Sequence, residues 1–214
     1  MRNKIVSVIL ARGGSKGIPR KNVIDLCGKP LIAYTIAASR GAGIEETWVS
    51  TDDAEIASAA KQYGAQVLLR PAELASDTAP SEAALLHFAK EVAFDWLVFI
   101  QPTSPLIESG DISKGIALME SGNYDSVFSA YEEHWMGTWN ERGEPRGWDI
   151  FHRPRRQEVG RTFRENGAFY ITKRKNLLES KLRYSGRIGI VPMSFYRSFQ
   201  IDTPEDLAFV ARLL

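Results

Sequence analysis

The sequence predicts an α/β fold in which helices cover both faces of a doubly wound, mostly parallel sheet. Short apolar segments alternate with helical patterns along most of the chain, which is typical of parallel strands joined by helices. Capping motifs and glycines mark the ends of several helices. With 214 residues, of which 44% are hydrophobic and 25% charged, the whole chain (1–214) is expected to form a single domain.

Each predicted strand is a short apolar run between turn residues. The first, Lys4–Ala11 (KIVSVILA), is almost continuously apolar, as expected of a strand buried on both faces of a parallel sheet. The same reasoning predicts strands at Glu46–Ser50, Gln66–Leu69, Trp96–Ile100, Ser126–Ala130, Ala168–Thr172 and Ile188–Val191.

Helical patterns separate these strands. The segment Pro30–Ser39 begins with a proline, which suits the first turn of a helix. Asp52 and Glu55 form a capping-box pattern for the next helix, which Gly64 ends. The remaining helices are predicted at Ser81–Val92, near Asp111–Ser121 and behind a second capping box at Thr203–Asp206.

Residues 131–164 interrupt this alternation. The segment carries three of the five tryptophans (Trp135, Trp139 and Trp148), two short turns with glycine and proline, and five arginines in the stretch HRPRRQEVGRTFR (152–164). We interpret it as an excursion from the sheet that serves as a lid or as an arm between subunits. Aromatic side chains on an arm favour a homodimer; the alternative is that they fold back onto the parent sheet.

The bulk composition excludes several classes of function. A formal net charge of +1 gives no reason to expect a nucleic acid or a membrane surface as partner. The single cysteine, Cys27, rules out an internal disulfide and a cysteine-based metal site. No run approaches the ~18–20 apolar residues that span a bilayer, and the chain does not start with the apolar core of a signal peptide. We therefore expect a cytoplasmic protein.

The stretch VILARGGSKGIPRKNV (8–23) places glycines and cations directly behind the first strand. It lacks the Gly-Lys-Ser/Thr of a P-loop and the G-x-G-x-x-G of a dinucleotide-binding fold. It fits a turn whose backbone N–H groups approach phosphate while Arg12, Lys16, Arg20 and Lys21 supply positive charge. The alternative is a solvated basic loop.

Six motifs run from the first predicted strand to the last predicted helix. They are LARGGSKGIPRKN (10–22), VSTDD (49–53), RPAELASDTAPS (70–81), QPTSPL (101–106), ENGAFYI (165–171) and IDTPEDL (201–207). Together they resemble the acylneuraminate (nonulosonic acid) cytidylyltransferases, the family of the CMP-sialic acid synthetases. The resemblance implies a fold like that of the nucleotide-diphospho-sugar transferases, and a homodimer.

The resemblance also implies a reaction. A magnesium-dependent enzyme of this family couples CTP to the anomeric hydroxyl of a nonulosonic acid, of sialic, legionaminic or pseudaminic type, and releases pyrophosphate. Two alternatives stay open: nucleotidyl transfer with another nucleotide, for example GTP, or another sugar, and a nucleotide-binding homologue that is not catalytic. The motifs do not identify the acceptor acid.

Residue roles follow from the resemblance. The residues implied to bind the nucleotide are Ala11, Arg12, Gly13, Gly14, Lys21, Asn22, Arg70 and Ser81. Those implied to bind the sugar acid are Gln101, Arg156, Asn166 and Tyr170, and those implied to be catalytic are Arg12, Lys21 and Asp202. Without the motifs, Arg70 would be read as a surface arginine and Tyr170 equally as a core residue.

The metal site departs from the family pattern. Where the family carries Asp-x-Asp, this chain reads Gln200-Ile201-Asp202, so Asp202 is the remaining candidate ligand for Mg²⁺. One carboxylate and the oxygens of the nucleotide are enough for magnesium in many sites. The amide alternatively indicates weaker metal binding, a different sugar or a different nucleotide. An acid before a helix is also favourable without any metal.

Overall fold

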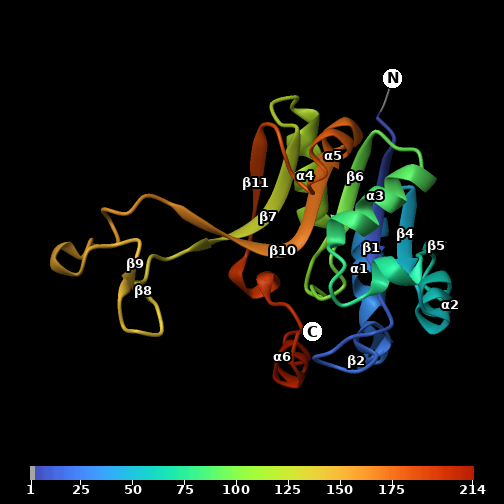
Figure 1. The fold of residues 1–214 in the computed structure, drawn as a ribbon, viewed down its shortest axis with the longest axis horizontal. Helices are drawn as coiled ribbons and strands as arrows, with labels where there is room; N and C mark the ends of the chain where they lie inside the picture. The colour runs from blue at the N-terminus through green and yellow to red at the C-terminus, as the bar shows by residue number, and fades with distance from the viewer. Residues whose placement is uncertain (1–2) are drawn as a thin grey trace.

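A seven-stranded sheet forms the centre of the computed structural model, which describes residues 3–214 (Figure 1). Its spatial order is β11-β7-β10-β6-β1-β4-β5. The strands are β1 (Ile5–Leu10), β4 (Glu46–Thr51), β5 (Gln66–Leu69), β6 (Trp96–Ile100), β7 (Ser126–Glu133), β10 (Thr162–Lys173) and β11 (Ile188–Met193). Neighbours are parallel, except that β10 runs antiparallel to β6 and β7. The predicted mostly parallel sheet is confirmed.

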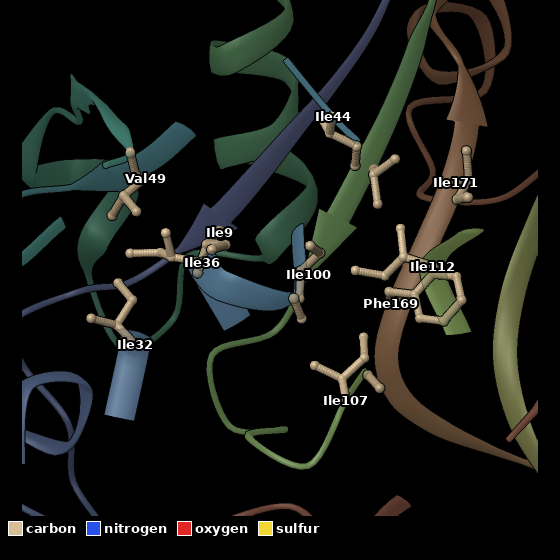
Figure 2. Close-up of a cluster of buried hydrophobic side chains, with 14 of the residues drawn as sticks. Ile9, Ile32, Ile36, Ile44, Val49, Ile100, Ile107, Ile112, Phe169 and Ile171 are labelled. Atoms are coloured by element: carbon tan, nitrogen blue, oxygen red, sulfur yellow. The ribbon is translucent and has the colours of Figure 1, made fainter. Parts of the chain in front are cut away.

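Helices lie on both faces of this sheet, as predicted. They are α1 (Leu31–Gly41), α2 (Ala54–Gln62), α3 (Ser81–Glu91), α4 (Ser109–Glu120), α5 (Arg174–Ser180) and α6 (Pro204–Val210). On one face, Ile36 of α1 and Ile112 of α4 share an apolar cluster with Ile100 of β6 (Figure 2). On the other, Phe88 of α3 shares a cluster with Leu97 of β6. The side chains of β6 therefore alternate between the helix layers on the two faces of the sheet. Within residues 3–214, no helix is long and apolar enough to cross a membrane.

The start of α2 differs by one residue from the prediction. The N-cap is Asp53, whose Oδ1 accepts from the N–H groups of Glu55 and Ile56, both at 2.9 Å. Asp52 instead accepts from the Gly13 N–H at 3.0 Å. The capping role predicted for Asp52 was therefore wrong, because this carboxylate holds the turn that follows β1. Of the two adjacent acids, Asp53 caps α2 and Asp52 stabilises the turn after β1.

Strands β7 and β10 extend beyond the predicted apolar runs. They pair as far as Glu133 with Thr162, and an ion pair of 2.8 Å links Arg164 to Glu133 across the pair. A second pair joins Arg161 to Glu132 at 2.8 Å. Cross-strand charges stabilise this extension instead of apolar burial. An apolar pattern could not predict it.

Residues 134–161 project away from the sheet (Figure 1). They include the short strands β8 (Thr138–Trp139) and β9 (Pro145–Arg146), which pair with each other. The indole of Trp148 packs edge-on against Trp135 and Trp139, with ring centroids 6.0 and 4.9 Å apart. The tryptophans thus pack on one another and do not fold back onto the sheet. Use of this arm as a lid or between subunits stays a prediction.

The order of the strands reverses at β1, which pairs with β4 on one side and β6 on the other. The carboxyl ends of these parallel strands lie at one edge of the sheet. Loops leaving such a switch point diverge and open a crevice, which is where α/β sheets bind ligands. Because β10 is antiparallel, its first half reaches the same edge beside the end of β6.

Asp53 makes the stability of the fold depend on pH. The Arg20 guanidinium, 2.5 Å away, is the main cause that lowers the pKa of Asp53 from 3.8 to about 2. A carboxyl with a lowered folded pKa stabilises the protein above its unfolded pKa and loses this effect as the pH falls through the folded one. We expect Asp53→Asn, which keeps the cap but not the charge, to reduce the free energy of unfolding by about 1 kcal/mol at neutral pH.

This difference in the free energy of unfolding between wild type and Asp53→Asn should shrink from about pH 4 to about pH 2, because the unfolded and folded pKa values of Asp53 bound this interval. Urea unfolding of both proteins at a series of pH values measures it. A difference that stays constant down to pH 2 would show that the Arg20 pair contributes nothing.

Candidate functional site

A cavity of about 540 Å³ opens at this edge, where β1 and β6 end. Its walls come from the turn after β1, the loop between β5 and α3, the end of β6 and the segment before α6. The predicted residues that line it are Arg12, Lys21, Asn22, Arg70, Ser81, Gln101 and Asp202. The predicted residues outside this lining are Ala11, Gly13, Gly14, Arg156, Asn166 and Tyr170.

The turn after β1 is fixed from behind. Asn22 is 4% exposed, and its side-chain amide donates to the carbonyl oxygen of Arg12 at 2.9 Å. Ala11 is buried and donates its N–H to the carbonyl oxygen of Ser50 at 3.0 Å. The carboxylate of Asp52 binds the Gly13 N–H, as described above. These residues shape the turn, while Arg12, Lys16 and Lys21 of the same turn line the cavity.

The segment before α6 closes one side of the turn. Lys21 Nζ donates to the carbonyl oxygen of Ile201 and to Asp202 Oδ1, both at 2.9 Å. The Lys21 side chain is only 14% exposed. A Cβ at Gly17 would lie 2.3 Å from the carbonyl oxygen of Asp202, so only glycine allows this approach. Residues at opposite ends of the chain therefore meet at the cavity.

Asp77 faces two cations of the turn. Arg12 Nη1 lies 2.7 Å and Lys16 Nζ 2.9 Å from its carboxylate oxygens. Hydrogen bonds from Lys16 and Arg12 hold the pKa of Asp77 below its ordinary value. Arg20 turns away and pairs with Asp53 at the start of α2, so the positive charge predicted for the phosphate-binding turn does not include it.

Arg70 is the most buried of the cations at the cavity. It follows β5 and is 7% exposed, and its Nε has no hydrogen-bond partner among residues 3–214. Burial lowers the pKa of its guanidinium; the carboxylate of Asp52 raises it, and the charge of Arg12 lowers it. A buried charge without full pairing is unfavourable. This site therefore has the electrostatic character of an anion receptor.

Gln101 lies where β6 meets β10. Its backbone N–H donates to the carbonyl oxygen of Ala168 at 3.0 Å, and its side chain lines the cavity. The side chain of Asn166 is instead used inside the protein: Oδ1 accepts from Ser129 Oγ at 2.6 Å, and Nδ2 donates to Ser198 Oγ at 2.9 Å. Asn166 is 5% exposed. The structure thus brings Gln101 to the cavity and keeps the Asn166 side chain behind it.

Tyr170 supports a wall of the cavity from within the core. It is 2% exposed and stacks on Phe99, with ring centroids 5.5 Å apart. Its hydroxyl donates to the Glu165 carboxylate, and burial is the main cause that raises the pKa of Tyr170. The Arg183 guanidinium lies 5.1 Å from the ring centroid. Phe99, not Tyr170, faces the cavity.

Arg156 lies on the projecting arm. It lines a separate hollow with Trp135, Met136 and Arg153. Arg153 lies 5.5 Å from the ring centroids of both Trp135 and Trp148, which orders this part of the arm. Within one chain, the structure does not bring Arg156 to the cavity.

Several lining residues were not singled out in the sequence, among them Asp77, Thr103 and Phe99. Asp77 belongs to the motif RPAELASDTAPS, and Thr103 to QPTSPL, so both were visible but not singled out. Phe99 is one letter of a continuous apolar strand, and nothing in that run distinguishes the face that meets a ligand. Position at a strand end was the signal that could have found Thr103.

The donors suited to a metal are few. No group of three or more His, Cys, Asp and Glu residues is arranged to hold an ion in the part of the chain that the structure describes. Asp202 offers a carboxylate at the cavity, and its side chain is 67% exposed. Magnesium commonly takes one or two protein carboxylates together with substrate phosphate oxygens. The donor set fits such a site.

Comparisons with known proteins show the family of the chain. The family model described as cytidylyltransferase matches residues 6–213. N-acylneuraminate cytidylyltransferase A of Danio rerio is 37% identical over 212 residues, covering 94% of this chain and 49% of that protein. Pseudaminic acid cytidylyltransferase of Campylobacter jejuni is 31% identical over 218 residues, covering 96% and 94%. The chain thus spans about half the length of the first relative and nearly all of the second.

Solved structures share the fold. A CMP:2-keto-3-deoxy-manno-octonic acid synthetase complexed with CTP superposes with a TM-score of 0.74 at 22% identity, covering 98% of both chains. A 4-diphosphocytidyl-2C-methyl-D-erythritol synthase of Anaerococcus prevotii gives 0.71 at 14% identity, covering 99% of this chain and 98% of that one. At these identities the likeness concerns the fold alone.

Proposed function

The chain belongs to the cytidylyltransferase family, and from this premise we propose that it joins CTP to the anomeric hydroxyl of a nonulosonic acid. The products are a CMP-sugar and pyrophosphate. The relatives that act on N-acylneuraminate and on pseudaminic acid support an acceptor of this class. The observation that carries the proposal is the convergence of Arg12, Lys21 and the buried Arg70 on one cavity at the switch point of the sheet.

The charge of these residues suits a triphosphate. Nucleotidyl transfer depends on in-line positioning and on neutralising the charge of the transferred and leaving groups. In our proposal Arg12 and Lys21 bind the phosphates, and Asp77 gives up its ion pair with Arg12 when they arrive. Each charge-assisted contact contributes roughly 1.5–3 kcal/mol. The turn that carries these side chains is already fixed by Asn22, so little ordering is required.

The remaining walls suit a base and a sugar acid. Leu10 and Phe99 form an apolar surface next to Arg70 and Ser81, on which a cytosine ring can lie. Gln101 offers an amide to the acceptor. The acceptor oxygen attacks the α-phosphorus, the bond to the pyrophosphate oxygen breaks, and the hydroxyl proton passes to solvent.

We propose Mg²⁺ as the cofactor, held by Asp202 and the oxygens of the nucleotide. When bound, it supplies charge neutralisation at the phosphates. Lys21 keeps the Asp202 carboxylate oriented toward the same part of the cavity. This proposal requires one protein carboxylate only, in line with the amide at position 200.

We also propose a homodimer in the cytoplasm. The arm exposes Met136, Trp139, Ile150 and Phe151, of which Phe151 is 87% exposed, and such apolar groups are commonly covered by a partner. A second chain is the route by which Arg156 could reach a substrate carboxylate. The single cysteine suits a reducing compartment.

The test is pyrophosphate release with the four nucleoside triphosphates against a panel of nonulosonic acids, on protein whose mass is measured by sedimentation. We expect release with CTP and one acid, and loss of release in EDTA. Pyrophosphate release with another nucleoside triphosphate would mean that CTP is not the nucleotide donor. Folded protein that binds CTP but releases nothing with any acid would favour a homologue that only binds nucleotide.

A further inference from the structure

We propose that Gln200 is a positioning residue that holds the irregular part of β10 at Asn166 and Gly167 (called the acceptor turn) beside Gln101, and that it acts as a hydrogen-bonding amide and not as a metal ligand. The consequence for acceptor binding rests on the proposed function; the consequence for the turn does not. The amide at position 200 thus has a structural role of its own. The resemblance alone left open that it only indicates the loss of a metal-binding carboxylate.

Both ends of the Gln200 side chain are engaged. Its Nε2 donates to the backbone carbonyl oxygen of Asn166, and its Oε1 accepts from Thr103 Oγ1 at 3.3 Å. The backbone next to it is fixed as well, because the Ile201 N–H donates to the carbonyl oxygen of Thr103 at 2.8 Å. Gln200 therefore links the loop after β6 to Asn166 in β10, where the pairing of β10 with β7 shifts register.

Gly167 shows how closely the amides approach. Its φ is +69°, a conformation that favours glycine, and a Cβ there would lie 2.4 Å from Gln200 Nε2 and 3.4 Å from Gln101 Nε2. The two glutamine amides thus meet at this glycine. Gln101 lines the cavity where we propose that the acceptor binds. The turn that Gln200 holds therefore supports the acceptor side of the cavity.

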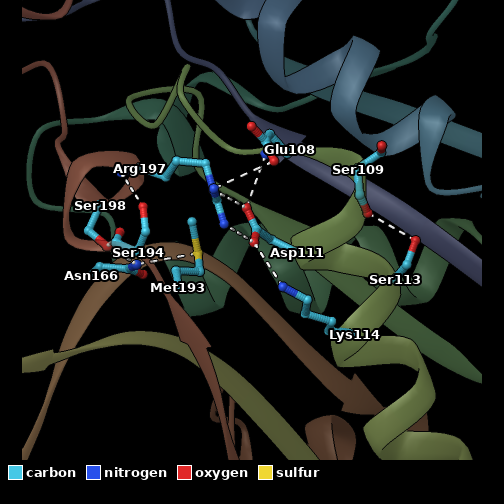
Figure 3. A network of polar contacts seen from close by, with 10 residues as sticks. All are labelled: Glu108, Ser109, Asp111, Ser113, Lys114, Asn166, Met193, Ser194, Arg197 and Ser198. Atoms are coloured by element: carbon cyan, nitrogen blue, oxygen red, sulfur yellow. Dashed lines mark hydrogen bonds and ion pairs between the residues drawn. The ribbon is translucent and has the colours of Figure 1, made fainter. Parts of the chain in front are cut away.

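A network behind the turn fixes it from the other side (Figure 3). Asn166 Nδ2 donates to Ser198 Oγ at 2.9 Å, in the 3₁₀ turn Phe195–Ser198. Arg197 of that turn binds the buried Asp111 through two hydrogen bonds of 3.0 and 2.9 Å. Asn166 is therefore held by Ser198 from behind and by Gln200 in front.

A carboxylate at position 200 of this chain cannot make the contact that the Gln200 amide makes with Asn166. An ionised Asp or Glu only accepts hydrogen bonds, and it would face the carbonyl oxygen of Asn166 with a second acceptor. Asp202, two residues further on, points to Lys21 instead. The geometry separates the two residues: Gln200 serves the acceptor turn and Asp202 the phosphate side.

Gln200→Glu and Gln200→Ala test the proposal, with Gln66→Glu as control. The first keeps the size of the side chain and removes its donor. Gln66 is exposed at the amino end of β5, the opposite edge of the sheet from the cavity. Hydrogen exchange of the backbone amides of residues 165–168 is measured first. We expect exchange at least ten-fold faster in both Gln200 variants and unchanged in Gln66→Glu.

Two further readouts separate positioning from metal binding. With CTP and no acceptor, Mn²⁺ binding followed by electron paramagnetic resonance should stay within two-fold of wild type in the Gln200 variants. The KM for the acceptor should rise at least ten-fold while the KM for CTP stays within three-fold. Unchanged exchange, or Mn²⁺ binding weakened ten-fold in Gln200→Ala, would overturn the proposal. If the wild type makes no CMP-sugar, the proposed function fails, and the exchange result still decides whether Gln200 positions the turn.

Discussion

Lys21→Ala is expected to lower kcat/KM for CTP by about 10²–10³-fold, the usual loss when one preorganised contact to a reacting charge is removed. Lys21 is the most firmly placed cation of the turn, since its ammonium binds both the carbonyl oxygen of Ile201 and the carboxylate of Asp202 at 2.9 Å. Its removal also takes away the contact that orients the Asp202 carboxylate toward the cavity. The variant thus loses a cation for the phosphates and the support of the proposed metal ligand together.

Steady-state kinetics with varied CTP measure this loss, and Lys175→Ala is the control. Lys175 lies in α5, and its side chain is 81% exposed. We expect its kcat/KM to equal that of wild type. Lys21→Arg should recover only part of the activity, because a planar guanidinium cannot reproduce the two contacts of the ammonium. Equal activity of Lys21→Ala and Lys175→Ala would mean that the triphosphate does not bind at this turn.

The fold followed from the sequence where local chemistry decides the structure. Gln66–Leu69 and Trp96–Ile100 are strands with the bounds that were predicted, because turn residues flank both apolar runs. The capping box at Thr203 is confirmed: its Oγ1 accepts from the Asp206 N–H at 3.2 Å, and the Thr203 N–H donates to Asp206 Oδ2 at 2.8 Å. Such signals lie within a few residues, so the sequence alone displays them.

Features set by distant residues could not be predicted in this way. The antiparallel direction of β10 depends on its pairing with β6 and β7, and its extension depends on charges such as Arg164 and Glu133. The division between Asp52 and Asp53 depends on the turn after β1. A motif identifies residues that matter, but the fold decides which of them faces the ligand.

The candidate site shows the same limit. Asn166 and Tyr170 belong to the motif ENGAFYI, yet their side chains are 5% and 2% exposed and are used in the core. Alternation along a strand gives two faces, and in a sheet covered by helices both are apolar. The sequence therefore indicated a strand that reaches the edge of the sheet at the cavity. It could not indicate that Phe99 and the backbone of the turn would form the wall.

Arg197→Met is expected to have the largest effect on stability. Asp111 is 1% exposed, and Arg197 pairs with it through two hydrogen bonds, so the variant leaves a buried carboxylate largely uncompensated. Removing one partner of a buried ion pair typically costs about 3–5 kcal/mol. For a chain of this length each kcal/mol shifts Tm by roughly 2–4 °C, so a decrease of about 6–20 °C is expected. Differential scanning calorimetry and urea unfolding measure it.

Matched variants attribute this loss to burial. Lys175→Ala breaks the exposed pair with Glu179, where the charged atoms are 3.9 Å apart, and should change stability by no more than about 0.5 kcal/mol. The double variant Asp111→Asn with Arg197→Met should regain part of the stability, because a neutral amide is less costly to bury than a charge. If Arg197→Met is as stable as Lys175→Ala, the Glu108 N–H and Lys114, 3.2 and 4.0 Å from the carboxylate, satisfy Asp111 by themselves. If it is not, the ion pair that secures the turn behind Asn166 is also a principal support of the fold, and changes at the acceptor side will be felt in its stability.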